Sequence, residues 1–354
     1  MSATRGMSGR RTLGLVAAGV LAAAGLTGLM ARGAAADPVL PPLTPAELLT
    51  RMADADVDGL SATFEQRSDL GLPALPTGSL PNGDEVQTAL SMLTGTHTVR
   101  VWLAGPEHAK VALVDGSTES SVVRNGNDVW AWSSEKQQAR HATLKPGEKP
   151  GPSAAPTSPS EAIAKLLAAV APTTDVTTSG TGYVAGRPVY QLVLTPKDGD
   201  SLVGQVRVSV DSQTFLALGA RVIADDGSDA VTVAATSADF SRPDDAIFAF
   251  APPPGAEVTE VSVPAGPPTR PAHTGDKPKV HGTGWTAVAV ADVGKQEPDQ
   301  AMTTLLESLP EVSGTWGHGR LLATTLVTAV ITDDGRVAVG AVTPERVYAA
   351  LAEK

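Results

Sequence analysis

The sequence predicts an α+β protein dominated by antiparallel strands, followed by a second, smaller α+β unit. Residues 205–211 alternate strictly between valines and polar residues, and this period of two indicates a half-buried strand. Segments 220–224 and 230–234 flank an Asp-Asp-Gly-Ser sequence, which is typical of a hairpin turn. Residues 252–279 are rich in proline and lack long apolar runs, so they predict a boundary between two domains.

Residues 1–36 have the features of an export signal. Arginines precede the apolar stretch Leu13 to Met30, and Ala34-Ala35-Ala36 offers a small-residue cleavage site. The pair Arg10-Arg11 also suggests twin-arginine export. The alternative is an uncleaved membrane anchor, because the apolar stretch is close to the length that spans a bilayer.

A helix and a strand are expected after this signal. Thr44 is a good N-cap and Pro45 a good first residue for a helix that runs to about Ala55. A strand then begins near Leu60, and a second short helix is expected over residues 85–93.

Four more strands are expected before a Pro/Gly/Ser-rich segment at 145–159, with Asn125-Gly126 as a hairpin turn. These strands are 99–103, 109–114, 121–125 and 128–132. Ser160 then caps a helix that Pro172 ends, and the apolar stripe of this helix must lie on another surface.

The C-terminal part predicts two helices and three strands, with a turn at Asp333-Asp334-Gly335. The strands are 285–292, 321–332 and 337–342, and the helices are 299–309 and 344–351. The domains expected are therefore 1–36 for the signal or anchor, 37–258 for the strand-rich domain, 259–279 for a linker and 280–354 for the small α+β domain.

Composition excludes several function classes. The chain has a formal net charge of −11, so we expect no nucleic-acid partner, because phosphate binding requires clustered cations. It has no cysteine, which excludes disulfides and thiol chemistry. It also lacks the common nucleophile, phosphate-binding and zinc-protease motifs, so we expect no enzyme and no cofactor.

One metal motif is present. Asp54, Asp56, Asp58, Gly59 and Glu65 have the spacing of an EF-hand calcium loop. An EF-hand needs a helix after the loop, whereas glycines and prolines follow here. We therefore interpret the motif as a helix end, a turn and a strand, and expect no metal.

Three tryptophans are ligand-pocket candidates. Trp130 and Trp132 are two residues apart and so share a strand face, and Trp102 lies on the face opposite Val101. They either line an apolar pocket or pack in the core.

Several strand motifs, in this order, resemble the LolA-type bacterial lipoprotein carriers. They are Ala62-Thr-Phe-Glu-Gln66, Val101-Trp-Leu103, Gly126-Asn-Asp-Val-Trp130, Gln191-Leu-Val-Leu-Thr-Pro-Lys197 and Phe248-Ala-Phe-Ala-Pro-Pro253. Val184-Ala-Gly-Arg187 and Val339-Gly-Ala-Val342 are similar to motifs of the RseB/MucB-type periplasmic regulators, which share this fold and add a smaller C-terminal domain.

The resemblance implies a strongly curved, open half-barrel sheet, with helices over its concave face and a cavity for acyl chains. It implies a periplasmic or other extracytoplasmic protein that binds a lipid or an acylated protein as a carrier. The alternative is a sensor that regulates an anti-sigma factor, with the C-terminal domain binding a membrane protein. The candidate cavity and lid residues are Phe64, Val101, Trp102, Leu103, Trp130, Trp132, Ile163, Leu166, Leu167, Val170, Leu192, Leu194, Val206 and Val208.

One departure from the carrier pattern concerns its lid. The carriers place an arginine before the proline of their second strand, where it latches the lid, and this chain has Gly105 there. The segment from Asp69 to Thr94 is extra relative to a simple hairpin and offers a substitute lid.

Overall fold

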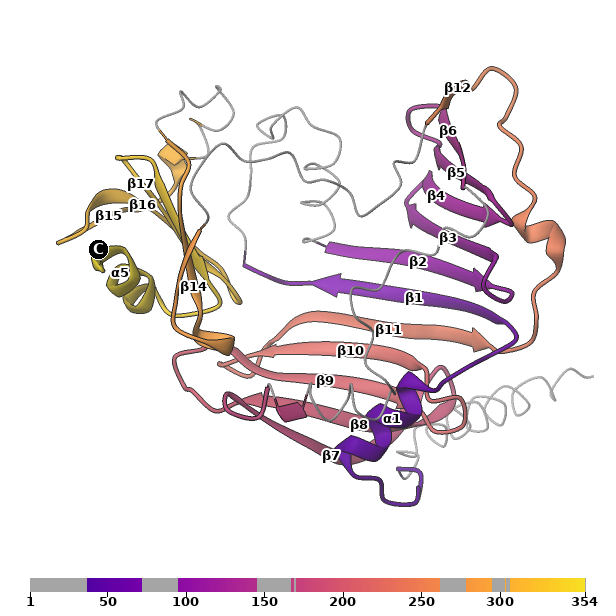
Figure 1. Ribbon diagram of the computed structural model, residues 1–354, viewed down its shortest axis with the longest axis horizontal. Helices are drawn as coiled ribbons and strands as arrows, with labels where there is room; N and C mark the ends of the chain where they lie inside the picture. Colours follow the sequence, from indigo (N-terminus) through magenta and orange to yellow (C-terminus); the bar gives the residue numbers. More distant parts are fainter. Residues whose placement is uncertain are drawn as a thin grey trace, which may run out of the picture. The chain divides into compact units, whose positions relative to one another are not determined.

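Two largely antiparallel sheets contain most of the described chain (Figure 1). The computed structural model describes residues 37–71, 95–144, 167–168, 170–261, 278–294, 303 and 306–353. The chain divides into two units, Met1–Pro38 and Val39–Lys354, and both sheets belong to the second unit.

The first sheet has twelve strands in the order β12-β6-β5-β4-β3-β2-β1-β11-β10-β9-β8-β7. Its strands are β1 (Leu60–Ser68), β2 (Gly95–Leu103), β3 (His108–Asp115), β4 (Thr118–Asn125), β5 (Asp128–Ser133), β6 (Gln138–Thr143), β7 (Thr174–Val184), β8 (Arg187–Pro196), β9 (Val203–Asp211), β10 (Ala217–Ala224), β11 (Asp229–Asp239) and β12 (Glu257–Glu260).

Two meanders of hairpins meet at β1, which pairs with β2 on one side and β11 on the other. The predicted turns are present: Gly126 and Gly227 have φ of 62° and 86°, values that glycine adopts without strain. The edge strands β12 and β7 do not pair with each other, so the sheet is curved but not closed into a barrel.

Helix α1 (Pro45–Ala53) packs on one end of this sheet. It begins with a capping box, in which the Thr44 hydroxyl accepts from the Glu47 amide at 3.3 Å and the Glu47 carboxylate accepts from the Thr44 amide at 2.8 Å. Leu48 is fully buried against Tyr190 and Val210. Most of the predicted helix after Ser160 lies outside the described residues.

The second sheet has six strands in the order β13-β14-β18-β17-β16-β15. They are β13 (Lys279–His281), β14 (Val288–Asp292), β15 (Glu311–Gly314), β16 (Gly317–Ala323), β17 (Thr328–Thr332) and β18 (Arg336–Gly340). Helix α5 (Pro344–Ala352), which the sequence predicts, covers one face, and its Val347 and Leu351 pack on the buried Val288, Val330 and Ala338.

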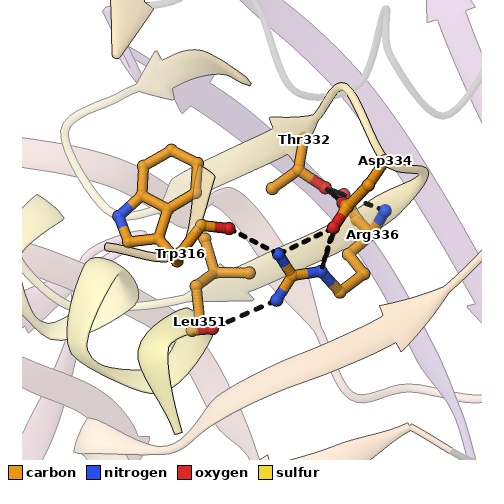
Figure 2. Close-up of polar contacts among 5 residues, drawn as sticks. All are labelled: Trp316, Thr332, Asp334, Arg336 and Leu351. Atoms are coloured by element: carbon orange, nitrogen blue, oxygen red, sulfur yellow. Dashed lines mark hydrogen bonds and ion pairs between the residues drawn. The ribbon is translucent and has the colours of Figure 1, made fainter. Parts of the chain in front are cut away.

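Arg336 connects several parts of the second sheet and α5 by hydrogen bonds (Figure 2). Its guanidinium donates to the carbonyl oxygens of Trp316 at 2.7 Å and Leu351 at 3.1 Å. It also pairs with Asp334 at 2.9 Å, and this contact, together with the Thr332 hydroxyl, lowers the pKa of the Asp334 carboxyl. One side chain thus links the end of α5 to two turns of the sheet.

Several predicted elements were wrong. Residues 321–332 are not one strand, because a turn in which the Thr324 hydroxyl accepts from the Val327 amide separates β16 from β17. Residues 248–250 do not form a strand; the 3₁₀ helix η1 (Asp245–Phe248) ends there. Another 3₁₀ helix, η2 (Gly284–Thr286), precedes β14. The predicted helix at 85–93 lies outside the described residues, and the helix at 299–309 lies only partly within them.

Candidate functional site

The two faces of the first sheet follow from the strand register. Leu192 lies opposite Val208, and the register continues across β10 and β11 to Gln66 in β1. Alternation along β1 and β2 then places Val101 on the same face. Because α1 packs on this face, we name it the α1 face.

The α1 end of this face is closed by the chain itself. Leu192, Leu194 and Val208 pack in one cluster with Leu48 of α1. In the described part of the chain, these three candidate residues are therefore covered by α1 rather than by the predicted helix after Ser160.

Apolar side chains remain exposed farther along the α1 face. Val101 lies opposite Val111, which lies opposite Val122. Val111 is 43% exposed and Val122 is 51% exposed, although both lie in central strands. Leu103 and Val206 share this face and are half-buried. These side chains form an apolar row on the α1 face.

The three tryptophans lie on the opposite face, which we name the Trp face. Trp130 and Trp132 lie opposite Val123 and Ser121, and Trp102 is also on this side. Phe250 covers two of them, with ring centroids 5.4 Å from Trp130 and 6.1 Å from Trp132. These tryptophans therefore pack against the chain itself, and they cannot line one cavity together with Val101.

The remaining candidates do not join either group. Phe64 packs in a separate cluster with Val189, Leu218 and Ala235. Leu167 and Val170 are half-buried at the end of a helical segment. Ile163 and Leu166 lie outside the described residues, as does nearly all of the predicted substitute lid between Asp69 and Thr94.

The calcium-loop motif adopts the structure interpreted from the sequence. Asp54 is the C-cap of α1, and Glu65 lies within strand β1, where it pairs with Arg67 at 2.8 Å. A strand rather than a helix follows the loop. Among the described residues, no group of three histidine or acidic side chains could hold a metal ion.

A buried ion pair was not predicted. Asp211 is fully buried, and its carboxylate accepts from Arg187 Nε at 2.6 Å and from the Thr214 amide at 2.8 Å. Burial raises the pKa of this carboxyl, but the hydrogen bonds from Arg187, Thr214 and Gln213 outweigh burial, so the net pKa is lowered. The sequence signal that could have pointed to this pair was the Val184–Arg187 motif, because it contains Arg187.

Backbone hydrogen bonds join the two sheets. The Leu202 amide donates to the Ala341 carbonyl at 2.9 Å, and the Thr343 amide donates to the Asp200 carbonyl at 3.3 Å. Trp285 Nε1 also donates to the Thr174 hydroxyl at 2.8 Å. The two sheets are therefore in direct contact through backbone and side-chain hydrogen bonds.

Gly105 occupies the turn between β2 and β3 with φ of 68°. This positive φ explains why a glycine occupies the turn, since other residues are strained in this backbone conformation. No helix among the described residues has both the length and the apolar character needed to cross a membrane.

An open, curved sheet with an exposed apolar row, followed by a second, smaller sheet, is the arrangement that the strand motifs led us to expect. Residues 85–256 match the family model of the MucB/RseB N-terminal domain. This match supports the resemblance to the superfamily of LolA-like and RseB/MucB-like proteins that the strand motifs predicted.

The solved structures to which this chain is similar include two MucB complexes. The complex of MucA and MucB from Pseudomonas aeruginosa has a TM-score of 0.45 and 15% identity, covering 87% of this chain and 96% of that chain. MucB in complex with the periplasmic part of MucA has a TM-score of 0.45 and 14% identity, covering 87% and 97%. A LolA-superfamily protein from Nitrosomonas europaea has a TM-score of 0.23 and 12% identity, covering 59% and 99%. The comparison with curated proteins gives no match.

Proposed function

We propose that this chain is a non-catalytic, extracytoplasmic sensor of the RseB/MucB type. Its ligand is the acyl part of a lipid or of an acylated protein. Its ligand site is the exposed part of the α1 face, and residues 280–354 form the domain that binds a membrane-bound anti-sigma factor. The match of residues 85–256 to the MucB/RseB domain and the presence of a second sheet support this assignment.

The exposure of Val111 and Val122 carries the ligand proposal. A hydrocarbon chain forms no hydrogen bonds, so its binding free energy comes from buried apolar area, about 25 cal/mol per Å². Two exposed valines on neighbouring central strands, with the half-buried Val101 beside them, offer such area without requiring the core to open.

Native mass spectrometry of the exported protein tests the ligand. We expect bound lipid in the wild type and its loss in the double variant Val111→Asp and Val122→Asp. The matched control is Val258→Asp, because Val258 lies on an edge strand and is 49% exposed, and this variant should retain lipid. Lipid retained by the double variant, or a wild type without lipid, would contradict the proposed site.

The carrier function is the second candidate, favoured by the LolA-like motif at 191–197. It predicts the same ligand but transfer to an acceptor rather than a stable partner. Co-purification of the full chain with membrane proteins, compared with a chain truncated after residue 279, distinguishes the two. Capture of an anti-sigma factor that requires residues 280–354 supports the sensor. Lipid transfer between vesicles without such capture supports the carrier.

A further inference from the structure

Three exposed arginines form a row across the Trp face of the first sheet. Arg207 in β9 lies directly opposite Arg221 in β10, which lies opposite Thr232 in β11. Thr232 in turn lies opposite Arg67 in β1. All three arginine residues are exposed, and with strands about 4.8 Å apart the row is roughly 14 Å long. We name Arg67, Arg207 and Arg221 the arginine row.

This arrangement works against the stability of the sheet. Like charges directly opposite each other on neighbouring strands are destabilising, and Arg207 and Arg221 are such a pair. Arg207 Nε donates to the side-chain oxygen of Gln205 at 2.5 Å. Within the described residues, no carboxylate lies within ion-pair distance of Arg207. Its charge is therefore not neutralised by the part of the chain that the structure describes.

The other two arginines have only exposed partners. Arg67 pairs with Glu65; the Arg67 side chain is 69% exposed and the Glu65 side chain is 39% exposed. Arg221 pairs with Asp229, with 49% and 45% exposed. Such surface pairs are weak, so these guanidinium groups can exchange their partners for external anions at little cost.

The row contrasts with the chain as a whole, whose formal net charge is −11. A negatively charged surface is repelled by most of such a protein. Arg100 is exposed on the same face, one strand beyond β1, which extends the positive area. Arginine is also the side chain that best matches the geometry of phosphate oxygens.

We propose that the arginine row docks the protein on membranes that contain anionic phospholipid. The row lies on the sheet face opposite Val111 and Val122, so docking through it leaves the proposed acyl site uncovered. The inference does not rest on that site, because it follows from the register and charges of the row alone.

Co-sedimentation of the full chain with vesicles tests this proposal. We expect binding to phosphatidylcholine vesicles that contain about 30% phosphatidylglycerol to exceed binding to pure phosphatidylcholine vesicles, and the excess to fall with added salt. The variant Arg207→Gln with Arg221→Gln should lose this excess by about fivefold or more per arginine removed.

The variant Arg140→Gln with Lys279→Gln is the matched control, since it removes the same charge from two exposed residues outside the row. It should keep most of the excess binding. An equal loss in both double variants would mean that net charge alone matters and would overturn the proposal, as would unchanged binding by the row variant. Thermal unfolding should show the row variant at least as stable as the wild type, because its like-charge pair is gone.

Discussion

Arg187 and Asp211 form a polar pair in the first sheet, and the Asp211 side chain is fully buried. Arg187 closes the turn from β7 to β8, and its guanidinium stacks 4.6 Å from the centre of the Phe240 ring. The carboxylate of Asp211 is held by Arg187 and by the backbone of the turn after β9. This pair fixes two turns at the same end of the sheet.

Replacing Arg187 with Met should destabilise the protein by about 3 kcal/mol or more, because it leaves a buried carboxylate without its cation. Arg242→Met is the control, since Arg242 pairs with Asp245 with 50% and 74% of the side chains exposed, and it should cost less than about 1 kcal/mol. Urea unfolding of both variants measures the difference. Equal costs would mean that the buried pair contributes no more than a surface pair.

Sequence reasoning reached the strand faces but not this pair. The alternation of valines in β9 identifies the buried face, because the period of two is local information. The pairing of Arg187 with Asp211 depends on the register of β8 on β9, which a single sequence does not specify. For the same reason the sequence did not show which face Trp130 and Trp132 share with Val101 or Trp102. Trp102 was grouped with Val101 although alternation along their own strand already placed these two residues on opposite faces.

At the scale of elements, β12 is the shortest strand of the first sheet. It has four residues, all exposed, and pairs in parallel with β6 at the edge of the sheet. His141 of β6 binds it through Glu260 at 3.0 Å and contacts Asp128 of β5 at 3.1 Å on its other side. The hydrogen bond to Glu260, with a further contribution from Asp128, raises the pKa of His141.

The raised pKa of His141 predicts that the attachment of β12 to β6 depends on pH. Because the folded-state pKa is raised, the ion pair contributes its full stability below the unfolded value of about 6.5 and loses it as pH rises through the folded pKa. Hydrogen exchange of the Glu257 and Val261 amides, which donate to β6 and its preceding turn, should be slower at pH 6 than at pH 8 after correction for intrinsic rates. The His141→Gln variant should lose this difference, and a difference that persists in the variant would assign it to another group.

Hairpin signals predicted the elements better than any other feature. The turns at Asn125-Gly126 and 225–228 were predicted because each contains a glycine, which adopts the positive φ of a tight turn without strain. Strand β6 was missed because Gln138-Ala-Arg-His-Ala-Thr143 has only one β-branched residue. The turn between β16 and β17 was missed because it contains neither glycine nor proline and lies between apolar residues.

For the whole molecule, the organisation depends on contacts between distant segments. Strand β1 joins the two meanders only by pairing with β11, and local patterns do not encode such a pairing. The resemblance of ordered strand motifs supplied this level of the fold, and composition and periodicity did not. The same holds for the contacts between Leu202 and Ala341, which connect the two sheets.

These contacts predict that the two sheets unfold together. Thr174 is buried, and its hydroxyl accepts a hydrogen bond from the indole Nε1 of Trp285. Thr174→Val keeps the shape but leaves the indole donor unpaired, which should weaken the junction by about 1 kcal/mol or more. We expect the hydrogen-exchange protection of β14 and β17 to fall relative to that of β9 and β10 in this variant.

Thr286→Val is the matched control, because Thr286 is also buried but donates to the Thr283 carbonyl within its own 3₁₀ turn. It should lower the stability of the second sheet without lowering the urea dependence of its exchange. In Thr174→Val that dependence should decrease, because the second sheet then opens without the first and exposes less surface. If Thr174→Val leaves the urea dependence at the wild-type value, the junction does not couple the sheets, and a signal from the proposed acyl site to the second sheet would need another route.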